Sequence, residues 1–147
     1  MNLKRYNYSV SNDFQRYSFY SIGPKGKIKK TVTYTKIQEG PVIYNLAFGD
    51  EDPVTGRIND NIISNNEDRD IVLATVANTI HAFIGYYGNH FIFAKGSTPS
   101  RTRLYQMSIA RLMDEISMDF NVFGIIANDV SAFKRNVNYD AFLIKKK

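Results

Sequence analysis

The first third of the chain contains three segments rich in Tyr, Phe, Ile, Val and Thr, the residue types that suit a pleated sheet. These segments are residues 16–22, 28–37 and 42–48. Between the first two lies the turn signature Gly23-Pro24-Lys25-Gly26, because Pro presets φ at the second position of a turn and Gly is favoured at the fourth. The pattern predicts a β-hairpin, extended by the third segment into an antiparallel meander.

The rest of the chain alternates between helical and extended patterns. Apolar residues recur every three or four positions, which predicts one helix that begins near residues 68–70 and ends near Gly85 or Gly88, and a second at residues 104–118. Short apolar runs predict strands at residues 89–94, 120–127 and 139–144, and residues 128–138 are polar and turn-like. We therefore expect an α+β fold with a single mixed sheet, in the order β-β-β-α-β-α-β-β, with two main helices.

This order of elements resembles the ribonuclease H-like architecture, in which three antiparallel strands precede alternating helices and strands. Nucleases of that architecture hold two metal ions with carboxylates from the first strand, the first helix and the fourth strand. Residues 16–22 and 89–94, the corresponding strand segments here, contain no Asp or Glu. The resemblance therefore extends to topology and argues against a two-metal nuclease.

Length and composition set the expected class of protein. The 147 residues, 44% of them hydrophobic, fit one domain spanning residues 1–147. There is no cysteine and no apolar run long enough to span a membrane, so we expect a cytoplasmic protein without membrane association. We also expect a flexible segment at residues 1–13, a long polar loop at residues 49–66, and a basic tail at residues 145–147.

The charge balance favours an anionic partner. Nineteen Lys and Arg residues against fourteen Asp and Glu residues give a formal net charge of +5. The basic residues cluster in the predicted hairpin and at the C-terminus, whereas the acidic residues cluster at 50–52 and 67–70. A basic surface of this kind is typical of proteins that bind nucleic acid or other anions, although a solvated surface explains it equally well.

The most distinctive stretch is the junction between the strand predicted at residues 89–94 and the second helix. It reads Gly96-Ser97-Thr98-Pro99-Ser100-Arg101-Thr102-Arg103. Backbone amides, hydroxyls and guanidinium groups at the start of a helix are the groups that bind anions. The candidate anion-binding residues are Lys25, Lys27 and Lys29 of the hairpin and Gly96, Ser97, Thr98, Ser100, Arg101, Thr102, Arg103 and Tyr105 of the junction.

The same junction also has a purely structural interpretation. Ser100 or Thr102 can cap the helix and Pro99 suits its first turn. A cap needs no arginine, however, and cations are unfavourable at the positive end of a helix dipole. Arg101 and Arg103 therefore require compensation, either from the acidic residues at 50–52 or 67–70 or from an external phosphate.

No sequence motif assigns a reaction. The junction lacks the Gly-Lys-Ser/Thr ending of a phosphate-binding P-loop, and neither His81 nor His90 lies in a recognisable catalytic or metal-binding motif. We therefore predict no catalytic residue, no metal and no cofactor. A metal-independent enzyme stays open as an alternative, with Arg103 and Tyr105 as the first residues to test.

Two non-enzymatic functions are open on this evidence. The first is a binding module for nucleic acid or a phosphate-bearing ligand, in which Tyr17, Tyr20 and Tyr34 would stack on bases. The second is a protein-interaction module that uses an exposed sheet face, either as a homodimer or as one half of a bacterial two-gene system. The first is the function that the charge pattern favours.

Three sequence stretches carry a resemblance that covers the chain from about residue 17 to its C-terminus. They are Gly23-Pro24-Lys25-Gly26-Lys27-Ile28, the junction extended to Leu104-Tyr105, and Tyr139-Asp140-Ala141-Phe142-Leu143. In these features the chain resembles a small bacterial family of uncharacterised single-domain proteins of about 150 residues. The resemblance implies one free-standing domain and brings no activity or catalytic residue.

Overall fold

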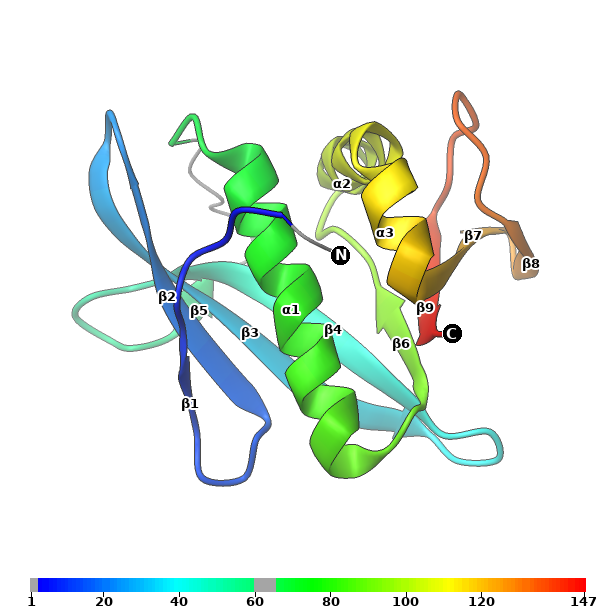
Figure 1. The fold of residues 1–147 in the computed structure, drawn as a ribbon, viewed down its shortest axis with the longest axis horizontal. Helices are drawn as coiled ribbons and strands as arrows, with labels where there is room; N and C mark the ends of the chain where they lie inside the picture. The colour runs from blue at the N-terminus through cyan, green and yellow to red at the C-terminus, as the bar shows by residue number, and fades with distance from the viewer. Residues whose placement is uncertain (1–2, 60–65) are drawn as a thin grey trace.

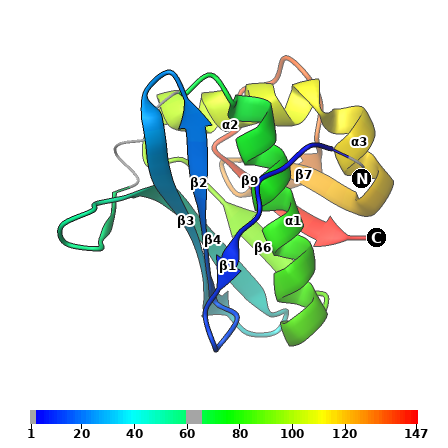
Figure 2. The ribbon, with the colours of Figure 1, turned by 60° about the vertical axis from the view of Figure 1, so that its left-hand side comes forward.

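A computed structural model describes residues 3–59 and 66–147. It shows a mixed sheet with the helices on one of its faces (Figures 1 and 2). The strands, in chain order, are β1 (Ser9–Val10), β2 (Arg16–Gly23), β3 (Gly26–Gln38), β4 (Ile43–Glu51), β5 (Ile58–Asn59), β6 (Phe91–Ala94), β7 (Phe120–Ile126), β8 (Asp129–Ala132) and β9 (Ala141–Lys146). The helices are α1 (Arg69–Tyr87), α2 (Pro99–Arg111) and α3 (Met113–Asp119). The α+β class with a single mixed sheet is as the sequence predicts.

The N-terminal meander is confirmed. Strand β2 pairs antiparallel with β3, and β3 pairs antiparallel with β4. Gly23 pairs with Gly26 at the end of the first hairpin, so the turn lies where the Pro and Gly signals place it. Strands β3 and β4 extend beyond the predicted segments, because residues with weak strand preference continue a ladder that its neighbours already hold.

Strand β6 pairs in parallel with β4, with Ile43 opposite Phe91 and Leu46 opposite Ala94. Parallel neighbours need a long crossover connection, and α1 provides it on one face of the sheet. The sheet order is β1-β2-β3-β4-β6-β9-β7-β8, with β5 paired to β4. The C-terminal strand β9 thus lies between β6 and β7, which is a long-range pairing that the order of elements alone does not reveal.

The main core lies between the meander and α1. Tyr17 on β2, Val32 and Tyr34 on β3, and Phe83 on α1 are all fully buried. The Tyr34 and Phe83 rings stack at 4.2 Å between centroids, so an aromatic layer joins sheet and helix. Burial also raises the pKa of Tyr34 well above its ordinary value, which keeps its hydroxyl neutral as a hydrogen-bonding group.

Both chain ends contribute strands to the sheet. The described part of the N-terminal segment, for which flexibility was expected, contains β1 and binds α1: Tyr6 N donates to Thr75 Oγ1 at 2.9 Å, and Tyr8 Oη donates to Asn78 Oδ1 at 2.8 Å. The expected basic tail is largely strand, because β9 continues to Lys146. Hydrogen bonds to distant residues, which composition cannot show, join both ends to the rest of the fold.

The expected loop at residues 49–66 is shorter than predicted. Strand β4 continues to Glu51, and the chain then turns back so that β5 pairs with the end of β4. Asp52 Oδ1 accepts hydrogen bonds from Val54 N and Thr55 N, which forms the turn. Residues 60–65 of the predicted loop lie outside the described residues.

The second predicted helix is two helices. Helix α2 begins at Pro99, five residues earlier than predicted, because Thr98 accepts a hydrogen bond from Arg101 N and serves as the N-cap in place of Ser100 or Thr102. Leu112 then separates α2 from α3 with φ −100° and ψ 12°. Among the described residues, no helix is long and apolar enough to cross a membrane.

Two buried tyrosines on adjacent strands give a test of the core. Tyr34 Oη shares a hydrogen bond of 2.8 Å with Thr79 Oγ1, whereas Tyr17 Oη has no partner among the described residues. We expect Tyr17→Phe to raise the free energy of unfolding by about 1 kcal/mol, since it removes an unsatisfied polar group. Tyr34→Phe should lower it by about 1 kcal/mol. Urea unfolding of both variants checks this, and equal destabilisation by the two would contradict it.

Candidate functional site: a cavity with one charged end

A partly open cavity of about 200 Å³ lies between α1, the α2–α3 pair and the sheet. Most of its wall is apolar and comes from all three helices and from β4, β6, β7 and β9. The apolar lining residues are Leu46, Phe48, Val72, Leu73, Val76, Ala77, Ile80, Ala94, Leu104, Ile109, Ile116, Phe120, Val122, Phe142 and Ile144. Helix α1 and the α2–α3 pair therefore do not close completely over the sheet.

Most of the polar lining residues come from the elements at one end of the cavity, which we call the charged end; the others, Tyr105 and Ser108, lie further along α2. Strand β6 finishes at Ala94, so Lys95 and the junction follow at the carboxyl end of the parallel pair. Helices α1 and α2 begin here as well, at Arg69 and Pro99. The residues of the charged end are Lys30, Asn66, Asp68, Arg69, Lys95 and Arg101. In open α/β sheets, ligands commonly bind at the carboxyl ends of the strands.

Two buried acidic groups at the charged end are satisfied within the fold. Lys30, 1% exposed, places its Nζ 2.6 Å from Asp50 Oδ1, so these two buried charges neutralise each other. Asp68 Oδ2 accepts hydrogen bonds from Tyr6 Oη at 2.6 Å and Ser21 Oγ at 2.5 Å. The carboxylate of Asp68 thus ties the N-terminal segment and β2 to the start of α1.

The junction folds as a tightly bonded helix start. Gly96 N donates to Thr102 Oγ1 at 3.0 Å, which joins the end of β6 to the first turn of α2. A Cβ on Gly96 would lie 2.4 Å from Thr102 N, so the close approach requires glycine. Thr98 caps the helix, whereas Ser100 is exposed in the first turn. Most of the hydroxyls that suggested an anion site therefore have local structural roles.

The two arginines of the junction have different surroundings. Arg101 lines the cavity, and its Nη1 donates to Ser97 Oγ at 2.9 Å. Arg103 is exposed, and its Nη1 donates to Asn138 Oδ1 at 3.0 Å. Arg103 forms no ion pair with a described residue of the acidic clusters at 50–52 and 67–70. For Arg103, the compensation expected from those carboxylates is therefore not found among the described residues.

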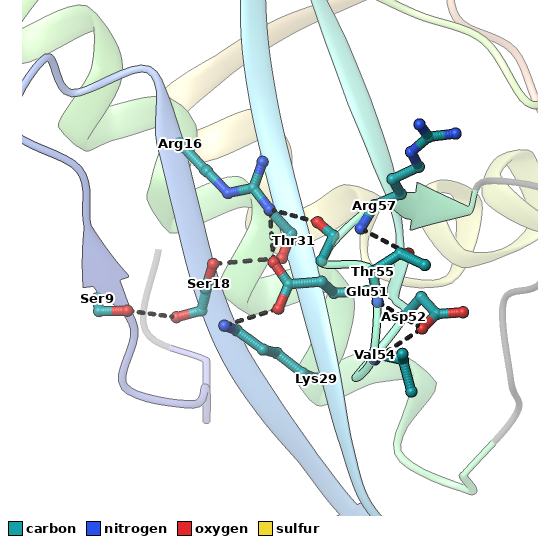
Figure 3. Close-up of polar contacts among 11 residues, drawn as sticks. Ser9, Arg16, Ser18, Lys29, Thr31, Glu51, Asp52, Val54, Thr55 and Arg57 are labelled. Carbon is teal, nitrogen blue, oxygen red and sulfur yellow. Dashed lines mark hydrogen bonds and ion pairs between the residues drawn. The ribbon is translucent and has the colours of Figure 1, made fainter.

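Glu51 and Asp70, two carboxylates of these clusters, pair with cations outside the junction. Glu51 lies 2.5 Å from Arg16 Nη2 and 2.7 Å from Lys29 Nζ, on the sheet face opposite the helices (Figure 3). The hydrogen bond from Lys29, and with it that from Arg16, lowers the pKa of Glu51 against the opposing effect of burial. Asp70, in the first turn of α1, pairs with Arg111 at the end of α2 at 3.2 Å.

The hairpin lysines and the junction do not form one site. Successive residues of a strand point to opposite faces, so Lys27 and Lys29 lie on the face opposite the one that Lys30 shares with the cavity. Lys27 Nζ lies 4.4 Å from the ring centroid of Tyr20, and Lys29 binds Glu51. Lys25 is exposed in the turn, where its backbone N donates to Asn66 Oδ1. The hairpin lysines and the junction residues predicted to bind one anion therefore lie on two separate surfaces.

The aromatic candidates are divided in the same way. Tyr17 and Tyr34 are fully buried and cannot stack on a base, whereas Tyr20 is 44% exposed. Tyr105 lines the cavity, but Arg103 does not, so the pair suggested for a metal-independent enzyme does not converge. In the described ranges, no group of three or more His, Asp or Glu side chains could hold a metal ion.

Sequence reasoning missed the cavity and three of its four cations, Lys30, Arg69 and Lys95. Arg69 and Lys95 line the charged end, yet each stands in the sequence as an ordinary charged residue at the edge of a predicted element. One signal was available for Lys95, since it directly follows a short apolar strand before a helix. No sequence signal indicates that the helices leave space between them.

Fold and site together define an α+β protein whose helices and sheet enclose an apolar cavity with cations at one end. A family model matches residues 2–147, and the chain belongs to that family, a family of unknown function (DUF6934). Comparison with curated proteins and with solved structures finds no match. The resemblance to an uncharacterised family of about 150 residues is thus confirmed, and the ribonuclease H-like topology stays a prediction.

The close approach at Gly96 can be tested against a matched glycine. Gly96→Ala should lower the free energy of unfolding by about 1–3 kcal/mol, because the added Cβ meets the Thr102 backbone. Gly85→Ala in α1 is the control: nothing lies within 4 Å of its Cβ position, so the better helix former should raise stability by up to about 1 kcal/mol. Thermal unfolding measures both, and a neutral Gly96→Ala would contradict the close-packed junction.

Proposed function

We propose that the protein is a non-enzymatic binding module for an anionic ligand, held at the charged end of the cavity by Lys95 and Arg101. The observation that supports this most directly is that both side chains line a cavity whose wall is mostly apolar. A cation beside apolar walls binds an anion more strongly than the same cation in open water, because screening by solvent is weaker there.

The distribution of charge at this end supports the same proposal. Four lining side chains are cationic, Lys30, Arg69, Lys95 and Arg101, and the one described carboxylate among them is Asp68. Lys30 is committed to Asp50 and Asp68 to two hydroxyl groups. Arg69 and Lys95 form no ion pair with any described carboxylate. The net charge of the described side chains that line this end of the cavity is therefore positive.

An NMR titration with inorganic phosphate at low ionic strength tests the proposal. Amide shifts should concentrate at residues 95–104, and Lys95→Gln or Arg101→Gln should weaken phosphate binding about fivefold to tenfold, as expected for loss of a charge-assisted hydrogen bond. Lys36→Gln removes the same charge from the surface pair with Glu39 and should leave binding unchanged. Equal losses in Lys36→Gln would show only a general charge effect and would contradict the site.

A second candidate is nucleic-acid binding by the hairpin surface. It is favoured by one contact, the ammonium of Lys27 over the exposed ring of Tyr20, because an aromatic ring beside a cation is a common platform for a stacked base and its phosphate. This surface is separate from the cavity, so the two candidates predict different sensitive residues.

Binding to a single-stranded oligonucleotide separates the candidates. If the hairpin is the site, affinity should fall steeply with salt, and Tyr20→Ala with Lys27→Gln should weaken it at least about tenfold. Arg101→Gln should then have little effect. Fluorescence anisotropy at several salt concentrations measures this, and salt-independent or undetectable binding would exclude the hairpin candidate.

A further inference from the structure

Apart from Ser108 on α2, the wall of the cavity away from the charged end is apolar and consists largely of core residues. Ile80 on α1, Ile116 on α3 and Phe120 at the start of β7 line it and are only 4%, 7% and 1% exposed. Val122 on β7 and Ile144 on β9 complete this wall from the sheet. Space beside such side chains excludes water and favours an apolar guest.

We infer that the ligand is a small amphipathic acid, with its anionic group at Lys95 and Arg101 and its apolar body among Ile80, Ile116 and Phe120. The inference rests on the proposed function and adds the ligand class to it. The cavity supplies both halves of the recognition: cations at one end and an apolar wall beyond them.

The volume limits the size of the apolar body. An apolar cavity of roughly 150 Å³ holds a benzene molecule, so a cavity of this kind accepts a body of about that size or a short alkyl chain. The space here is about 200 Å³. A single aromatic ring or a medium-length alkyl chain therefore fits, whereas the polycyclic body of a sterol or a long acyl chain does not.

The charge distribution selects the head group. A guanidinium presents a planar pair of donors that matches a carboxylate or phosphate, and Lys95 adds a point charge. Asp68 lies at the same end and would repel an anion, but Tyr6 and Ser21 already hold its Oδ2. An amine would gain the Asp68 carboxylate but meet Arg69, Lys95 and Arg101, so the cavity selects against it.

Isothermal titration with straight-chain carboxylates from acetate to octanoate tests the inference on the wild-type protein. Affinity should rise about fourfold per added methylene, the value for burying one such group, and then level off when the cavity is full. Octanol and octylamine should bind at least about tenfold more weakly than octanoate. Octyl phosphate serves to distinguish a phosphate from a carboxylate head group.

Variants that fill the cavity provide the structural control. Ala77 on α1 and Ala94 on β6 line it, so Ala77→Phe should abolish the dependence on chain length, and Ala94→Leu should reduce it. Both should keep the binding of inorganic phosphate. Ala132→Leu on the exposed strand β8 adds the same bulk outside the cavity and should change nothing.

The outcomes separate the two proposals. If phosphate binds at residues 95–104 but affinity does not rise from acetate to octanoate, the amphipathic acid is overturned as the ligand and the proposed function stands. If affinity still rises with chain length in Lys95→Gln and Arg101→Gln, and is not weakened by them, these residues do not bind the anionic head group. That result would overturn the proposed function as well. Octanoate affinity unchanged in both filled variants would show binding outside the cavity and would overturn the inference.

Discussion

The parallel pairing of β4 with β6 is the constraint on which the rest of the structure depends. Because these strands run in the same direction, the chain must cross from the end of one to the start of the other, and α1 is that crossing. The pairing also places the end of β6, and therefore the junction and the start of α2, at the same end of the sheet as the start of α1. Both helices consequently lie over one face, and the cavity is the space they leave between them.

The junction that stands out in the sequence has a double role in the structure. Gly96, Thr98 and Thr102 form the helix start through local hydrogen bonds, so the hydroxyl-rich composition is explained by capping. Arg101, which donates to Ser97 Oγ, also lines the cavity together with Lys95. The candidate anion site is therefore the cationic end of a cavity rather than a loop that surrounds an anion.

Much of the fold could be predicted because its signals are local. Turn residues at 23–26 and apolar periodicity at 71–84 each act within a few positions, so they identified the first hairpin and α1 closely. The ends of α2 were predicted less well, because Thr98 and Leu112 decide them through their backbone conformation and hydrogen bonding. The candidate site was predicted only in part, since Arg101 was identified but Arg69 and Lys95 were not.

The sequence by itself determined the class of fold, the meander, the position of α1 and the presence of surplus positive charge, because propensity, periodicity and composition are properties of the chain. Only the tertiary structure decided which charges meet. Strand alternation sends Lys29 to Glu51 on one face and Lys30 to Asp50 on the other, and the insertion of β9 between β6 and β7 completes the cavity wall. Such pairings join residues distant in sequence, so no local pattern specifies them.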